Sequence, residues 1–200
     1  MAGLAVERVG APTAGRFGGV LLSRQATEND IDPLVALVTS AYRGDASREG
    51  WTTEAHLLEG QRIDADLLTA DLDNPHGLVL VWVDQEATGE GAADAIVACC
   101  NLVRKPDGVA YFGMFAVSPG RQGAGLGKQI LAEAERVARE EWSASALEIT
   151  VLEPRSELLA FYDRRGFTAT GSFVPYPYGD PRFGEPLRDD LRMVVMRKAL

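Results

Sequence analysis

Three glycines at alternate positions, Gly123, Gly125 and Gly127, mark the part of the sequence best suited to bind an anion. An apolar, strand-like run ends at Val117 just before them, and an amphipathic helix pattern begins directly after them. A glycine turn at the start of a helix exposes backbone N–H groups that have no partner within the helix, and the helix dipole favours negative charge there. The spacing therefore predicts an anion site, most naturally for phosphate.

Two nucleotide-binding patterns do not match this turn. A P-loop needs Ser or Thr after its Gly-Lys pair and a glycine five residues before that pair's glycine, but here the two positions hold Gln129 and Gln122. A dinucleotide fingerprint needs G-x-G-x-x-G near the start of a βαβ unit, whereas this turn reads G-x-G-x-G after several strands. Glycines can also serve close packing alone. Taken by themselves, they leave an anion site and a purely structural turn as alternatives.

The flanking sequence resembles the GNAT acetyltransferase superfamily. Gln122-Gly-Ala-Gly125-Leu-Gly127, preceded by Val117-Ser-Pro119, is similar to that superfamily's acyl-CoA-binding motif. Residues 158–167, LLAFYDRRGF, look like its second signature, an apolar-Tyr helix that ends in Gly-Phe. The resemblance spans about residues 93–173. It implies an α+β (mixed α/β) fold with a central, mostly antiparallel sheet of about six or seven strands, flanked by about four helices.

The resemblance also implies acetyl-CoA as the donor. The pyrophosphate of CoA would lie on the glycine turn, and the pantetheine arm would bind free backbone groups of the preceding strand. The residues expected to bind the donor in this way are Phe115, Ala116, Val117, Gln122, Gly123, Ala124, Gly125, Leu126, Gly127 and Lys128. Arg155 stands where many members carry an asparagine that contacts pantetheine. It could contact a CoA phosphate, the acceptor, or only solvent.

Catalysis in this superfamily is a direct attack of an amine on the thioester. Tyr162 occupies the position of the general acid that protonates the leaving thiolate, although a buried tyrosine can equally be a core residue. An alkyl amine is protonated at neutral pH, so a base or a chain of waters must remove a proton. Glu148 is the expected base, with Glu153 and Glu54 as alternatives.

Aromatic residues accompany the two irregular segments that border the acceptor side in this superfamily. An aromatic cage could bind an amine, and packing that pins long loops is the other interpretation. The expected substrate-binding residues are Tyr42, Trp51, Glu54, Tyr176 and Tyr178. The expected function is N-acetyl transfer to a primary amine of a small molecule or peptide. A longer acyl-CoA, or a CoA-binding sensor or partner domain without turnover, are the alternatives.

Composition limits the partners. The chain has 200 residues and a net charge of −9, which disfavours nucleic acid and anionic membranes and would weakly attract a cationic acceptor. Cys99 and Cys100 are adjacent on a predicted strand, so they face opposite ways and read as buried thiols of a reducing, cytoplasmic compartment. With only two histidines, no metal site is expected. A homodimer is possible, because dimers are common in the superfamily.

These residues need a scaffold, which hydrophobic periodicity predicts. Residues 1–17 are expected to form a loosely ordered arm, and residues 18–200 a single domain. Helices are expected over about 27–42, 52–72, 125–142 and 157–165, and strands over about 20–24, 78–83, 93–103, 109–117, 146–151, 167–173 and 191–197.

Overall fold

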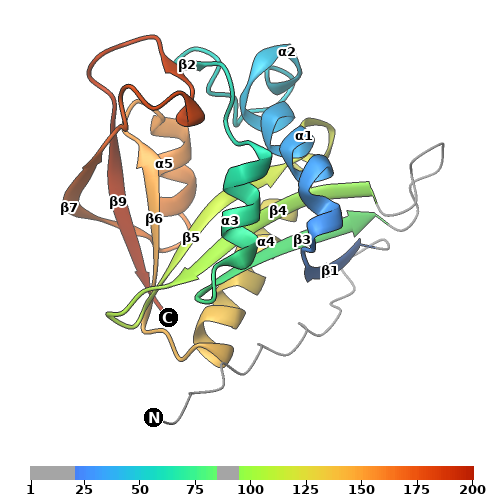
Figure 1. Cartoon of the computed structure of the whole chain (residues 1–200). Helices are drawn as coiled ribbons and strands as arrows, with labels where there is room; N and C mark the ends of the chain where they lie inside the picture. The colour runs from blue at the N-terminus through green and yellow to red at the C-terminus, as the bar shows by residue number, and fades with distance from the viewer. Residues whose placement is uncertain (1–20, 85–94) are drawn as a thin grey trace, which may run out of the picture.

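The computed structural model describes residues 21–84 and 95–200, so the expected arm at 1–17 lies outside the described residues. Seven strands form one sheet in the order β1-β3-β4-β5-β6-β9-β7, in which the β5–β6 pair is parallel and the other pairs are antiparallel (Figure 1). The predicted α+β class and mostly antiparallel sheet are confirmed. The strands are β1 (Leu21–Gln25), β3 (Gly77–Asp84), β4 (Ala95–Arg104), β5 (Val109–Val117), β6 (Ala146–Leu152), β7 (Thr168–Pro175) and β9 (Arg192–Ala199).

Helices cover both faces of the sheet. On β3, Leu80 and Trp82 pack with α4 and α5, while Val79 and Val81 point the other way into a second core with α1 and α3. Because both faces are buried, the strand reads as a continuous apolar run. The helices are η1 (Glu28–Asp30), α1 (Ile31–Tyr42), α2 (Gly44–Ser47), α3 (Ala65–Asp73), η2 (Pro119–Arg121), α4 (Leu126–Arg136), the π-helical η3 (Val137–Glu141), α5 (Ser156–Asp163) and η4 (Pro181–Phe183).

The predicted helix over 52–72 begins thirteen residues late, at Ala65. Asp64 is its N-cap and accepts a 2.8 Å hydrogen bond from the Leu67 N–H. Thr52 and Thr53, either of which could have capped a helix that began at the predicted position, are engaged elsewhere: the Thr52 hydroxyl donates to the Ala41 carbonyl (3.1 Å), and the Thr53 and Ser47 hydroxyls are hydrogen-bonded to each other (2.7 Å). The intervening chain instead forms the short strand β2 (Leu58–Glu59), which pairs with β8 (Glu185–Pro186).

The adjacent cysteines lie on opposite faces of the sheet, as predicted. Cys99 belongs to the core under α1 and α3, Cys100 belongs to the core under α4, and both thiols are free. Within the described residues, no helix is long and apolar enough to cross a membrane.

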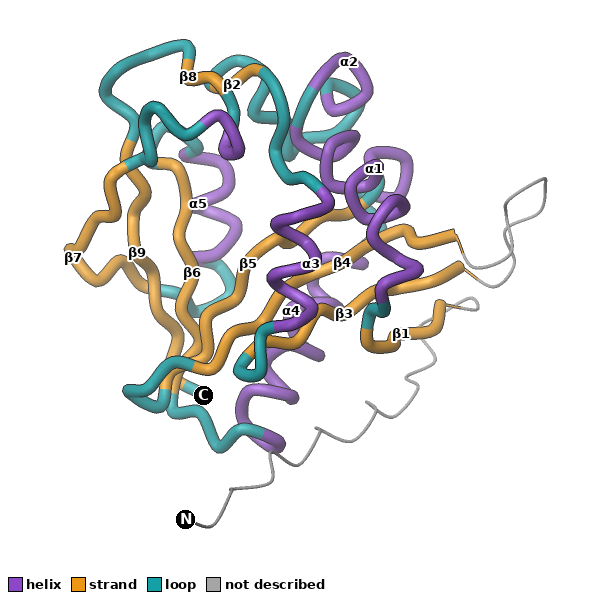
Figure 2. The backbone as a smooth tube through the Cα atoms, viewed as in Figure 1, coloured by secondary structure: helices purple, strands orange, loops and turns teal. Residues whose placement is uncertain are grey.

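The sheet opens between its two central strands. β5 pairs with β6 only over Val109–Tyr111, after which the two strands separate. Further along β5, the register with β4 shifts, and Met114 adopts φ +44° inside this bulge. Bulges re-aim backbone and side chains beside active sites. The loops around β2 and β8 gather at this end of the sheet, on the same side as α2 (Figure 2).

Candidate active site

Two cavities meet where β5 and β6 separate. The first, of about 380 Å³, is bordered by the glycine turn and is called here the glycine-turn cavity. The second, of about 490 Å³, contains three arginines and is called the arginine cavity. Tyr42, Phe115, Leu158 and Tyr162 line both cavities and therefore form the wall between them. Two ligands that bind on opposite sides of these residues could meet there.

The glycine turn has the geometry of an anion site. Gly123 and Gly125 adopt φ +84° and +83°, which an L-residue with a side chain rarely takes up. Within the described chain, no acceptor binds the backbone N–H groups from Gly123 to Gly127. These five consecutive donors lie at the start of α4, where the helix dipole favours negative charge. The first turn of any helix leaves N–H groups free, so the anion site and the purely structural turn both remain as alternatives at this point.

Gly127 serves a different purpose from the other two glycines. A Cβ at this position would lie 3.2 Å from Phe115 Cζ, closer than most real contacts. The glycine therefore lets α4 approach the aromatic ring that separates the two cavities. Lys128, Arg164 and Arg165 add three positive charges to the lining of the glycine-turn cavity.

Side chains already occupy two carbonyls of the β5 edge. The Tyr42 hydroxyl donates to the Phe115 carbonyl, and Gln122 Nε2 donates to the Val117 carbonyl over 2.9 Å. Gln122 also accepts from the Trp51 N–H (3.0 Å). Its amide thus ties the loop after α2 to β5, which is a positioning role distinct from the expected contact with the donor.

Tyr162 lies between the cavities with its hydroxyl available. Tyr162 is only 5% exposed, and its ring packs against the rings of Phe161 and Phe167 at centroid distances of 5.2 and 5.4 Å. Within the described residues, no hydrogen bond engages its hydroxyl. Burial, and then the nearby Tyr42, raise the pKa of Tyr162 well above 10. The phenol therefore stays protonated at neutral pH and can act as a donor.

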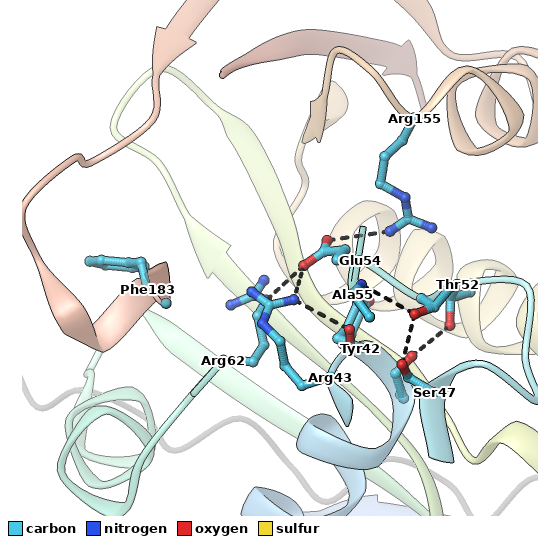
Figure 3. A network of polar contacts seen from close by, with 12 residues as sticks. Tyr42, Arg43, Ser47, Thr52, Glu54, Ala55, Arg62, Arg155 and Phe183 are labelled. Atoms are coloured by element: carbon cyan, nitrogen blue, oxygen red, sulfur yellow. Dashed lines mark hydrogen bonds and ion pairs between the residues drawn. The ribbon is translucent and has the colours of Figure 1, made fainter. Parts of the chain in front are cut away.

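The arginine cavity is organised around one buried carboxylate (Figure 3). Glu54 Oε2 lies 2.5 Å from Arg43 Nη1 and 3.9 Å from Arg62 Nε, while Glu54 Oε1 lies 3.3 Å from Arg155 Nη1. Burial alone would raise the pKa of Glu54, but the three guanidiniums more than offset this and hold it below its usual value of 4.5. Burial and the Glu54 charge raise the pKa of Tyr42 to about 12. Glu54 is thus a counter-ion and a poor base.

Asp71 is the second carboxylate of the arginine cavity. It projects from α3, and Asn101 is its hydrogen-bonding neighbour. Burial raises its pKa above 3.8, partly offset by that hydrogen bond. Asn101 pairs with Gly113 across the β4–β5 ladder, next to the bulge at Met114. Asp71 therefore lies beside the opening of the sheet and has the environment of a stronger base than an exposed aspartate.

Several residues predicted to form the site lie elsewhere. Glu148 lines neither cavity, because Lys105 Nζ (2.7 Å) and Arg197 Nε (2.6 Å) hold its carboxylate on the outer part of β6. Burial alone would raise the pKa of Glu148, but these two partners together lower it below 4.5. This arrangement is that of a structural ion pair, so the expectation of Glu148 as the base is corrected. Glu153 is likewise paired, with Arg192 (2.6 Å).

The aromatic residues divide between the two cavities. Tyr176 lines the arginine cavity, as expected of an acceptor residue. Trp51 instead lines the glycine-turn cavity and packs against Phe161 at a centroid distance of 5.3 Å. Tyr178 lines neither cavity and pins its loop by accepting a 2.6 Å hydrogen bond from the Leu191 N–H. The expected cage of four aromatics is therefore not formed.

Arg155 is the largest change from the expectation of a donor-binding residue. It is 1% exposed and lines the arginine cavity, not the glycine-turn cavity. Sequence reasoning did not identify Arg43, Arg62 or Asp71. A pair of arginines flanking a buried glutamate carries no sequence signal, since each residue alone looks like an ordinary surface charge.

Comparisons with known proteins identify the family and the fold. The model of the Acetyltransferase (GNAT) family matches residues 38–167, more than half of the chain. A solved ribosomal-protein-alanine N-acetyltransferase from Brucella melitensis is 20% identical, with a TM-score of 0.60, and the alignment covers 90% of this chain and 99% of that one. An acetyltransferase of the GNAT family from Staphylococcus aureus Mu50 is 15% identical, with a TM-score of 0.58 and the same coverage.

A third solved structure contains the expected donor. It is a Bacillus anthracis protein in complex with acetyl coenzyme A, 17% identical over 66% of this chain and 67% of its own, with a TM-score of 0.50. A search of curated protein sequences finds no significant match. At these identities the solved structures show the fold, and the family model shows the family.

Proposed function

Because the chain belongs to the GNAT acetyltransferase family, we propose that it transfers the acetyl group of acetyl-CoA to a primary amine. The observation that carries the proposal is the set of five free N–H groups from Gly123 to Gly127. Gly123, Gly125 and Gly127 line the same cavity as Tyr162. Acetyl-CoA supplies an acyl group activated as a thioester. The chain must bind its phosphates and place the thioester at the wall between the cavities. It must also accept the proton that leaves the amine and stabilise the leaving thiolate.

The glycine-turn cavity fits the donor. The five N–H groups would bind the pyrophosphate, and the three cations of the lining would contribute charge to the phosphate groups. Because the carbonyls of Phe115 and Val117 are already occupied, donor binding along β5 would use the N–H groups that remain, or displace the Gln122 amide.

The acceptor amine would approach through the arginine cavity. The neutral amine attacks the acyl carbon: a C–N bond forms, the C–S bond breaks, the nitrogen loses a proton, and CoA leaves as a thiolate that takes its proton from solvent. Asp71 is the carboxylate best suited to receive the amine's proton, because no arginine of the described residues pairs with it and burial raises its pKa.

Tyr162 would stabilise the leaving sulfur. A thiol has a pKa of about 8.5 and a phenol one of about 10, and burial raises the pKa of Tyr162 further, so complete proton transfer from this tyrosine is uphill. Its hydroxyl is therefore assigned a hydrogen bond to the developing thiolate. A hydrogen bond to a charged group contributes roughly 1.5–3 kcal/mol, so Tyr162→Phe should lower kcat by about tenfold to a hundredfold.

One experiment tests the proposal. CoA release from acetyl-CoA is followed with a library of amines, and the acetylated product is identified by mass. Tyr162→Phe should show the lower kcat given above, by about tenfold to a hundredfold, while it retains affinity for acetyl-CoA. A sensor domain would bind acetyl-CoA but release no CoA with any amine. A preference for a longer acyl chain would appear as faster release from propionyl- or butyryl-CoA.

A further inference from the structure

The arginine cavity contains buried donors that no group of the described residues engages, and we infer that they bind an anionic oxyacid group, first of all a carboxylate, carried by the acceptor itself. The inference rests on the proposed function and names its acceptor class. The acceptor would be a small amine that also bears a carboxylate, as an amino acid does.

The first observation is the unsatisfied guanidinium hydrogens. Arg155 is 1% exposed and its Nη2 has no hydrogen-bond partner. Arg43 is 4% exposed, and both its Nε and its Nη2 lack partners. These three nitrogens thus have no acceptor within residues 21–84 and 95–200. Buried polar groups are almost always hydrogen-bonded, and buried charges are paired. Three unpaired donors around one cavity therefore indicate a missing acceptor.

The second observation is the balance of charge. The two oxygens of Glu54 contact all three guanidiniums, and Arg155 alone of the three has a second carboxylate partner among the described residues, the half-exposed Glu157, 3.3 Å from its Nε. Asp71, the other carboxylate of the lining, has no ion pair with any of them among the described residues. One more carboxylate at the arginines would bring this end of the cavity close to neutrality. Forked guanidiniums recognise planar oxyacids through paired N–H groups.

The third observation is the size and roof of the cavity. At about 490 Å³ it falls within the range of small-molecule sites. Tyr176 and Phe183 line it from the segment between β7 and β9, Met193 lines it from β9, and the Tyr176 hydroxyl donates to the Phe183 carbonyl over 2.7 Å. Gly184 lets this roof approach, because a Cβ there would lie 2.6 Å from the Glu59 carbonyl and 3.5 Å from Arg43 Nη2. A cavity of this size suits a small molecule.

The inference departs from the expectation of a cationic acceptor. That expectation came from the net charge of −9 over the whole chain. Exposed charges farther away than about 10 Å are screened at ordinary salt, whereas groups that line a cavity are not. The local arginines therefore decide which acceptor binds, and Asp71 remains for the amine end of a zwitterion.

The test compares amines that differ only in the anionic group. Each of the twenty amino acids is offered with acetyl-CoA alongside its carboxamide, and aminoalkylphosphonates form a third arm that separates carboxylate from other oxyacids. The carboxamides have the less basic amine, so this bias works against the inference. We expect kcat/KM for the best amino acid to exceed that for its carboxamide at least tenfold.

Arg62 is the arginine to replace, because its side chain is 31% exposed and the fold should tolerate the change. Arg62→Gln should raise the KM for the amino acid at least tenfold, leave the carboxamide and acetyl-CoA unaffected, and be partly rescued by Arg62→Lys. Arg48→Gln is the matched control: Arg48 is 65% exposed and lines neither cavity. It should change nothing.

Distinct results overturn the inference and the function. Equal or better turnover of carboxamides, or an equal loss of both substrates in Arg62→Gln, would overturn the anionic acceptor while leaving the acetyltransferase intact. No CoA release with any amine would overturn the function. In that case, calorimetry with N-acetyl amino acids and their amides in the presence of CoA decides the inference, because equal affinity, or no binding of either, rejects it.

Discussion

Replacing Gly125 with alanine should destabilise the protein through backbone strain alone. Gly125 adopts φ +83°, and a Cβ built on it would meet no atom within 4 Å. A non-glycine residue in the left-handed region costs about 1–2 kcal/mol. In a chain of 200 residues, each kcal/mol lowers Tm by about 2–4 °C. The expected fall in Tm is therefore about 2–8 °C, without any steric clash.

Two neighbouring glycines provide matched controls. Gly120 has no positive φ, and a Cβ on it would also meet open space, so Gly120→Ala should shift Tm by less than about 1–2 °C. Gly127→Ala would bring a Cβ to 3.2 Å from Phe115 Cζ, and overpacking of this kind costs about 1–3 kcal/mol. The three variants thus separate strain, open space and crowding within one turn.

The assay combines thermal unfolding with calorimetric titration of acetyl-CoA. If the chain around Gly125 relieves its strain by rotating a peptide, an N–H group turns away from the ligand, and affinity should fall about tenfold. Equal Tm and equal affinity for Gly125→Ala and Gly120→Ala would refute the assignment of the turn as a strained anion site.

Three further predictions concern the rest of the site. Asp71→Asn should lower kcat at least about tenfold and remove the acid limb of the pH–rate profile; in the wild type, activity should rise with pH through a pKa above 3.8, and an unchanged profile would contradict the role. The pKa of Glu54 in the folded state is lowered from its usual value of 4.5. Its ion pairs should therefore stabilise the fold fully above about pH 4.5, and this stabilisation should be lost as the pH falls through the folded-state pKa. Accordingly, Glu54→Gln should cost about 3–5 kcal/mol in urea unfolding at pH 7, but much less in acid; a penalty independent of pH would contradict this. Gln122→Ala should lower the free energy of unfolding by about 1 kcal/mol and weaken acetyl-CoA binding, because Trp51 and β5 lose their link; unchanged affinity would leave Gln122 with no role in the site.

The donor side could be predicted because its residues are contiguous. The glycine turn, the strand before it and the helix after it form one segment, so spacing alone fixes their relation. The exact range of β5, Val109–Val117, was predicted for the same reason, since strong apolar patterning and a clear turn bound it. The bonds that occupy the Phe115 and Val117 carbonyls could not be predicted, because they depend on side chains packed from other elements.

The arginine cavity could be predicted only in part. Tyr42, Glu54 and Tyr176 were expected to bind the substrate and do line it, whereas Arg43, Arg62 and Asp71 were missed and Arg155 was assigned to the donor. These last four residues come from separate segments that only the tertiary fold brings together, and a charged residue without periodicity carries no signal of such a site. The misplaced start of α3 has a related cause. Tertiary hydrogen bonds of Thr52 and Thr53 outweighed their capping preference, and the loop that follows them contributes Glu54 and Arg62 to the lining of the arginine cavity.

The most direct test of the account is an acetyl-CoA titration followed through backbone amide resonances. The amides of Gly123, Gly125 and Gly127 should shift strongly downfield as the pyrophosphate engages their N–H groups, while that of Gly108, in the β4–β5 turn, should stay unchanged. Saturation with acetyl-CoA that leaves the three glycine amides unshifted would contradict the placement of the donor at this turn.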